Sequence, residues 1–307
     1  MSFTAIKLDR LPAPQIIEQP DFETIFEARK ARLIELAEQS GTPEYVAELR
    51  AALELESEPL VMLLQEDSFR EVLLRSAVQD AGQGNLLAFA SGAVLDHMAA
   101  FYGVSRQVVQ AADPAANPPL PETLEDDSRL RARVQLAPEG FTTAGSRGSY
   151  IFWALSAAPQ VKDVAVLETA TPGEVRIIVL STEGNGAPDA ALLAAVEEAT
   201  QPRRPLTDQV MVEAAAIQEF PVEAELTLYD GPDADLVRQA AQDALVAFLD
   251  EHHRLGHDIS IAGLYAALYQ PGVQDVTLTQ PAANLVIAAD AAAFCTGITL
   301  TVGGRDV

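Results

Sequence analysis

YIFWALSAAPQVKDVAV (residues 150–166) and GLYAALYQPGVQDVTL (residues 263–278) share one order of features, and that shared order decides the fold class. Each has apolar residues at helical spacing, then a proline, a valine, an Asp-Val pair and an apolar run typical of a strand. A helix-strand pattern that occurs twice in a chain indicates tandem modules of related structure. We therefore predict an α+β protein with two tandem α+β units, rather than a catalytic α/β barrel.

The sequence around these two stretches supplies the remaining elements of both units. Apolar and polar residues alternate in FPVEAELTLYD (residues 220–230), which is typical of a half-buried strand. Asp189 and Asp233 each follow a proline and precede an amphipathic run, so each is expected at the start of a helix. We expect the first α+β unit over residues 128–215 and the second over residues 216–307.

Residues 1–110 show helical patterns only. A helix is expected after Asp21, which is suited to an N-cap position, and further helices are expected from Pro43 and from Pro59. The helix from Pro59 carries apolar side chains in every direction around its axis, so it must be covered on all sides. That cover could come from an intramolecular bundle or from a partner helix. The candidate partner contacts on it are Leu60, Leu63, Leu64, Phe69 and Leu73.

Residues 111–127, AADPAANPPLPETLEDD, are rich in proline and acid and contain almost nothing suited to a core. Such a composition predicts an acidic, proline-rich linker or exposed loop. It would connect the N-terminal helical region to the two α+β units.

Three cations, Arg129, Arg131 and Arg133, follow this acidic segment and alternate with small or apolar residues. A period of two indicates a strand with the three guanidinium groups on one face. The cations could form ion pairs with the neighbouring carboxylates, or Arg131 and Arg133 could contact a partner protein. The sequence leaves both interpretations open.

The chain is strongly acidic, with 45 Asp and Glu against 20 Lys and Arg in 307 residues and a formal net charge of −25. A surface of this charge repels phosphate groups, so no nucleic-acid partner and no anionic membrane are expected. The single cysteine, Cys295, excludes an intrachain disulfide framework and is typical of a reducing compartment. No segment resembles a signal peptide or a transmembrane helix, so we expect a soluble protein.

Three of the four histidines lie within EHHRLGHDIS (residues 251–260). His253 and His257 have the spacing at which two histidines on one helix bind zinc, so a metal-dependent hydrolase using His253, His257 and Asp258 is the alternative function. However, Gly256 is suited to the end of the preceding helix, which would place His257 outside the helical geometry. Cys295 begins a final strand-like run and is interpreted as a buried apolar side chain rather than a nucleophile.

One long run resembles a known family. DSRLRARVQLAPEGFTTAGSRGSYIFWALSAAPQVKDVAV (residues 127–166), together with stretches around it, is similar to the baseplate J-like wedge proteins of contractile phage tails and phage-tail-like particles. The most specific features are the Arg131 and Arg133 pair, Thr-Ala-Gly-Ser at residues 143–146, and Val-Lys-Asp-Val at residues 161–164. The resemblance extends over nearly the whole chain.

The resemblance implies a structural building block with no enzymatic activity, no cofactor and no metal. Such a protein would join other baseplate wedge proteins in a six-fold plate around the tail hub. The implied partners are other wedge proteins, tail hub or sheath-proximal components, and further copies of the chain in a homodimer or ring. The implied location is the virion or tail-particle baseplate, after assembly in the bacterial cytoplasm.

Overall fold

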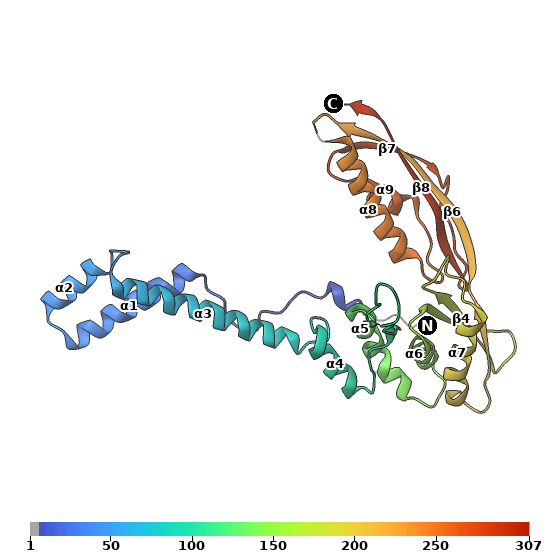
Figure 1. Cartoon of the computed structure of the whole chain (residues 1–307), viewed down its shortest axis with the longest axis horizontal. Coiled ribbons are helices and arrows are strands. Elements are labelled where there is room, and N and C mark those ends of the chain that lie inside the picture. Colours follow the sequence, from blue (N-terminus) through green and yellow to red (C-terminus); the bar gives the residue numbers. More distant parts are fainter. Residues whose placement is uncertain (1–5, 232, 307) are drawn as a thin grey trace. The chain divides into compact units, whose positions relative to one another are not determined.

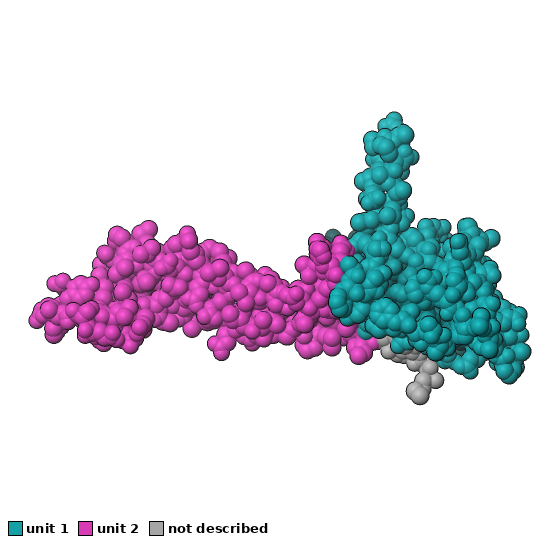
Figure 2. Space-filling model, turned by 90° about the horizontal axis from the view of Figure 1, so that it is seen from below, with its two compact units in different colours: residues 1–5, 99–307 teal, residues 6–98 magenta. Residues whose placement is uncertain are grey.

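The computed structural model describes residues 6–231 and 233–306, and the chain divides into two units. The helical unit is Ile6–Met98, and the α+β unit contains the chain from Ala99 onward (Figure 2, magenta and teal). Among the described residues, no helix combines the length and the apolar character needed to span a bilayer.

The helical unit contains a short 3-10 helix, η1 (Leu8–Arg10), and three α-helices, with a fourth at its end. These are α1 (Phe22–Ser40), α2 (Pro43–Ala52), α3 (Pro59–Gly84) and α4 (Gly92–Phe101), the last of which continues beyond Met98 (Figure 1). The expected starts are confirmed, because the Asp21 carboxylate accepts a hydrogen bond from the Thr24 N–H at 2.7 Å and proline occupies the first turn of α2 and of α3. The core of this unit is small and contains Phe26, Ala37, Leu49, Leu53 and Val61.

The first α+β module has three α-helices and a three-stranded sheet. In chain order its elements are α5 (Asp127–Leu136), η2 (Ala137–Phe141), α6 (Arg147–Ala157), β3 (Val161–Glu168), β4 (Glu174–Ser181), α7 (Ala190–Thr200), η3 (Gln201–Arg203) and β5 (Gln209–Ala214). The sheet order is β3-β4-β5, and β4 pairs antiparallel with β3 and parallel with β5. The buried cluster of this module joins Tyr150 and Ala154 of α6 to Ile177 and Val179 of β4 and Val196 of α7.

The second module is built on one long strand. Its elements are β6 (Ala216–Tyr229), α8 (Ala234–His252), α9 (Ile261–Leu268), β7 (Val273–Gln280) and β8 (Ala291–Asp306). The sheet order is β7-β6-β8, and helices α8 and α9 lie along one face of the sheet (Figure 1). The alternation in the sequence is confirmed, because every second residue of β6 points into the core: Phe220, Val222, Ala224, Leu226 and Leu228.

The two sequence stretches that share a pattern form equivalent structures. They are α6 with β3, and α9 with β7, and in each module the strand of the pair is the antiparallel neighbour of the central strand. Their places in chain order differ, because α6 and β3 precede the central strand β4, whereas α9 and β7 follow the central strand β6. The modules thus place equivalent elements in a different chain order, and the predicted α+β class with a helical N-terminal region is confirmed.

A thin ribbon precedes the first module. Strand β1 (Val108–Gln110) pairs antiparallel with β2 (Thr123–Leu124), and Asp113 and Leu120 exchange two backbone hydrogen bonds of 2.9 Å further along the ribbon. The proline-rich segment of residues 111–122 is therefore the outer part of a hairpin. We call residues 108–124 the arm.

Candidate assembly surfaces

Helix α3 places polar side chains on its intramolecular face. Val61, Ser68 and Gln79 are buried, and their spacing of seven and eleven residues aligns them on one side of the helix. The Gln79 carboxamide oxygen accepts hydrogen bonds from the backbone N–H groups of Ile16 and Ile17, at 2.8 and 3.2 Å. Near the C-terminal end of α3 the inner face is thus held by hydrogen bonds to the N-terminal segment that crosses it, whereas near its N-terminal end Val61 packs in the apolar core.

The outer side of α3 is apolar and uncovered in the single chain. Phe69 and Leu73 follow Met62 by seven and eleven residues, which places the three on one side of the helix, and Leu63 and Leu74 lie one position further around the axis. These five side chains are between 52% and 67% exposed. A helix that leaves a row of large apolar side chains exposed presents a contact surface for another protein. We call this surface the α3 stripe.

The sequence-predicted contacts on this helix divide into two groups. Leu63, Phe69 and Leu73 belong to the α3 stripe. Leu60 and Leu64 are half-buried and pack against the core of the helical unit. The sequence could not separate the groups, because a helix that is apolar in all directions does not indicate which side its own chain covers.

The strand expected at Arg129–Arg133 is wrong, since these residues lie in helix α5. The Asp126 carboxylate caps the helix by accepting a hydrogen bond from the Arg129 N–H at 2.9 Å, and Leu130 and Val134, four residues apart, are buried on one face. The period of two was misleading because Leu130 and Val134, which lie one helical turn apart, are also separated by an even number of residues. Arg131 is half-exposed on α5.

Ion pairing with the acidic run accounts for two of the three arginines. The side chain of Glu125 is fully buried; it contacts Arg133, which is 6% exposed, and the Arg129 Nε lies 3.2 Å from its second oxygen. The burial of Arg133 leaves almost none of its surface to a partner. The spacing of four and eight residues from Glu125 is the helical signal that could have revealed this cluster.

The Glu125 cluster also fixes the base of the arm. The Arg106 guanidinium donates to the Glu125 carbonyl oxygen at 2.6 Å, and the Gln107 N–H donates to the Glu125 carboxylate at 3.0 Å. The Glu125 N–H donates in turn to the Gln107 carbonyl oxygen at 2.9 Å. Charge-assisted hydrogen bonds in a buried site hold geometry tightly. The arm therefore leaves the module in a defined direction.

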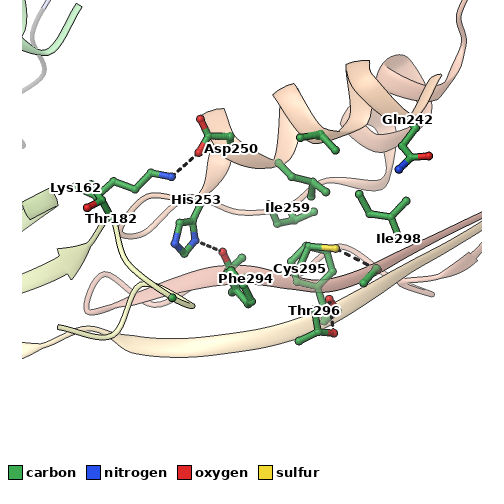
Figure 3. A pocket seen from close by; sticks show the side chains of 16 residues that line it. Lys162, Thr182, Gln242, Asp250, His253, Ile259, Phe294, Cys295, Thr296 and Ile298 are labelled. Carbon is green, nitrogen blue, oxygen red and sulfur yellow. Dashed lines mark hydrogen bonds and ion pairs between the residues drawn. The ribbon is translucent and has the colours of Figure 1, made fainter. Parts of the chain in front are cut away.

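A pocket of about 510 Å³ lies between α8, the first half of β8, the start of β3 and the loop that follows β4 (Figure 3). Lys162 forms an ion pair of 2.6 Å with Asp250 at one end, and this hydrogen bond holds the pKa of Asp250 below its ordinary value. The His253 Nδ1 lies 2.6 Å from the Ala293 carbonyl oxygen. Burial raises the pKa of the Cys295 thiol, so the thiol stays protonated and is a poor nucleophile.

The residues of the alternative metal site do not converge. Partial burial lowers the pKa of His253, and its Nδ1 is engaged by a backbone carbonyl. His257 lies beyond the end of α8, with its ring 6.2 Å from that of His252, and the Asp258 carboxylate accepts a hydrogen bond from the Ile287 N–H at 2.7 Å. In residues 6–231 and 233–306, no group of three or more histidine, cysteine or acidic side chains could hold a metal ion.

Three family models match successive parts of the chain. They describe the baseplate J-like N-terminal domain at residues 56–113, the central domain at residues 142–214, and the C-terminal domain at residues 220–301. Together they match more than half of the chain. The chain belongs to the baseplate J-like protein family. The resemblance of residues 127–166 to this family is thereby confirmed.

A relative shows the same relationship along the full length. Baseplate protein J of Escherichia phage P2 is 42% identical to this baseplate J-like chain over 303 residues, which cover 98% of this chain and 99% of the relative. A chain in the six-fold symmetrised baseplate of the anti-feeding prophage is also similar, with a TM-score of 0.41, 14% identity, and coverage of 62% of this chain and 44% of that chain. Family membership places the chain among the structural proteins of phage baseplates.

Proposed function

We propose that this baseplate J-like protein is a non-enzymatic wedge component of a contractile tail. It would assemble with other wedge proteins, and with further copies of itself, into a six-fold baseplate around the tail hub. Its place is then the baseplate of a virion or tail-like particle, after assembly in the bacterial cytoplasm. Support comes from the family membership and from the full-length similarity to a phage baseplate protein.

The α3 stripe is the observation that carries the assembly role. Its five apolar side chains are exposed on a helix whose other side already packs against the rest of the helical unit and binds Ile16 and Ile17 through Gln79. The single chain therefore leaves these side chains in contact with water. Burial of one leucine side chain contributes about 1.5–3 kcal/mol, so a partner helix on the stripe would gain substantial binding energy. A structural role in which α3 packs against a wedge partner follows from this surface.

The test is co-expression of the chain with the wedge proteins of the same tail, followed by affinity purification and size-exclusion chromatography. Leu63→Asp combined with Leu73→Asp places two charges on the stripe and is expected to abolish the complex. The matched control is Leu36→Asp with Leu55→Asp, which changes two leucines of similar exposure, 44% and 57%, elsewhere in the helical unit. If both double variants retain the complex, the stripe is not the docking surface.

A further inference from the structure

The arm is ordered but contacts little of its own chain. Every residue from 108 to 124 is exposed except Ala116, which is half-exposed. Val109, Leu120 and Leu124 are 44–50% exposed. Figure 2 shows a slender teal projection that stands away from the rest of the α+β unit, which agrees with the exposure of these residues. Because a buried ion-pair cluster fixes the base of the arm, the fold holds an apolar hairpin out in solvent.

The side of the arm that returns from its turn to β2 has a distinctive chemistry. Its sequence Asn-Pro-Pro-Leu-Pro-Glu (residues 117–122) contains three prolines, which offer no backbone N–H groups for adding a strand to a sheet. Exposed proline-rich segments are instead recognised by grooves lined with aromatic side chains. Glu122 adds one negative charge beside the prolines, and it is in ion-pair distance of no cation among the described residues.

A groove with one aromatic side chain, Trp153, lies on the first module, between α6 and α7. It has a volume of about 340 Å³ and small side chains on its floor, and its walls carry Trp153 and Arg203, with Glu198 at the rim. The Arg203 guanidinium lies over the Trp153 ring at 3.5 Å from its centroid. Within the described part of the chain, no carboxylate lies in ion-pair distance of Arg203.

We propose that the arm of one copy inserts its proline-rich side, residues 117–122, into the Trp153 groove of a second copy. The aromatic ring and the alanine floor would contact the prolines and Leu120, and Arg203 would pair with Glu122. Charge supports the choice of occupant. Two chains of net charge −25 repel each other except where an acid of one meets a cation of the other, and the Arg203 guanidinium contacts the Trp153 ring and the Ala199 carbonyl oxygen rather than a carboxylate.

The position of the groove favours a reciprocal exchange. Ser156, at the edge of the groove, accepts a hydrogen bond on its carbonyl oxygen from the Gln107 side chain at 3.0 Å, and Gln107 belongs to the base of the arm. Each copy thus carries the arm base and the groove close together. Two copies related by a twofold axis could each donate an arm and receive one, which is the isologous arrangement of most homodimers. This inference gives a contact for the self-association named in the proposed function, and it rests on that part of the proposed function alone.

A charge exchange in the full chain tests the contact. Glu122→Arg and Arg203→Glu are each expected to weaken self-association by about tenfold or more, measured as a dissociation constant by sedimentation equilibrium. The two together restore the ion pair with its direction reversed, and should recover most of the affinity. A wild-type chain that stays monomeric, or single variants that associate like wild type, would overturn the proposal. Absence of recovery in the double variant would also overturn it.

A second measurement uses Trp153, the single tryptophan of the chain. A variant in which a short Gly-Ser turn replaces residues 111–122 has an empty groove, and a peptide of residues 111–124 should change its tryptophan fluorescence in a saturable way. A peptide with serine at positions 118, 119 and 121 is the control and should bind about tenfold more weakly. Equal responses to both peptides, or none, would contradict the groove assignment.

The two surfaces can fail independently. The Leu63→Asp and Leu73→Asp double variant should still bind the arm peptide, because the α3 stripe lies in the other unit. The Arg203→Glu variant should still form the complex with wedge partners. Loss of the wedge complex in the α3 variant alone would leave the arm contact in place, and loss of peptide binding in Arg203→Glu alone would leave the α3 role in place.

Discussion

The buried carboxylate of Glu125 accepts a hydrogen bond from the guanidinium of Arg133, and both side chains are almost fully enclosed. Replacement of Glu125 by alanine would leave the Arg133 and Arg129 charges in a dry site without their partner. We expect Glu125→Ala to lower the free energy of unfolding of the α+β unit by about 3–5 kcal/mol. Urea denaturation followed by circular dichroism measures this loss.

Glu122→Ala is the control for that change, because Glu122 is exposed on the arm. Its effect on unfolding should stay within about 0.5 kcal/mol. An equal effect of the two substitutions would mean that the Glu125 cluster does not stabilise the fold.

The helical unit should tolerate charge on the α3 stripe in the isolated chain. Leu63 and Leu73 are 57% and 53% exposed, so their replacement by aspartate should change the thermal stability of the unit little. Val61 is 2% exposed on the opposite side, and Val61→Asp should unfold the helical unit because it buries an unpaired charge. Far-UV circular dichroism separates the cases, and helix loss in the Leu63→Asp and Leu73→Asp variant would show that these leucines belong to the intramolecular core.

His253 should make the second module less stable in mild acid. Partial burial lowers the pKa of His253 below the ordinary value of about 6.5 in the folded state, so the unfolded chain binds more protons between those two pKa values. The free energy of unfolding should therefore fall as the pH drops below about 6.5, until the folded-state pKa is passed.

The measurement for this pH effect is the difference between wild type and His253→Gln, in melts at successive pH values. Glutamine can also donate to the Ala293 carbonyl oxygen but does not titrate, so carboxylate effects common to both proteins cancel. Parallel pH curves for the two proteins would contradict the assignment.

Metal removal should leave the protein unchanged. His253 and Asp258 already contact backbone groups, at 2.6 and 2.7 Å, and do not face one another as ligands. We expect purified protein to contain no stoichiometric zinc and to melt at the same temperature with and without chelator, since a metal bound only to the folded state would raise that temperature. Bound metal that is lost in a His253→Ala and His257→Ala variant would instead support the hydrolase alternative.

The arm should be the first site of limited proteolysis in the monomer. Its exposed residues 111–122 lie outside both strands of the ribbon, whereas residues from 125 onward are held by the Glu125 cluster. Mass spectrometry of early fragments should map cleavage there, and cleavage should slow at concentrations where the chain self-associates. Earlier cleavage within residues 128–215 would contradict this order.

The sequence predicted the two α+β modules because the helix-proline-strand pattern depends on local spacing. Their permuted order was beyond reach, since strand pairing is a long-range property and the same α6–β3 pattern fits either side of a central strand. The aspartate that both patterns share likewise forms contacts that its local pattern does not predict. Asp163 accepts a hydrogen bond from the Leu255 N–H at 2.9 Å, while the matching Asp275 accepts one from the Tyr269 hydroxyl.

The assembly surfaces were predicted in part. The apolar excess on α3 was visible in the sequence, but the outward direction of Leu63 and Leu73 depends on Gln79 and the chain that it binds. The groove at Trp153 left no sequence signal, because Arg203 reaches the ring from a different element. Local sequence patterns indicate which apolar residues should be buried, whereas only the folded chain shows which of them stay exposed.

The single residue Ala215 between β5 and β6 has a mechanical consequence. It is buried and donates a hydrogen bond to the Val179 carbonyl oxygen, so an extended backbone runs with almost no break from one sheet into the central strand of the next. A pull along this backbone loads the cross-strand hydrogen bonds of β4, β7 and β8 in shear, many at once, because those bonds lie across the strand direction. Peeling would break them one at a time. The connection through Ala215 therefore lets one module transmit tension to the other while the strands of both sheets stay paired.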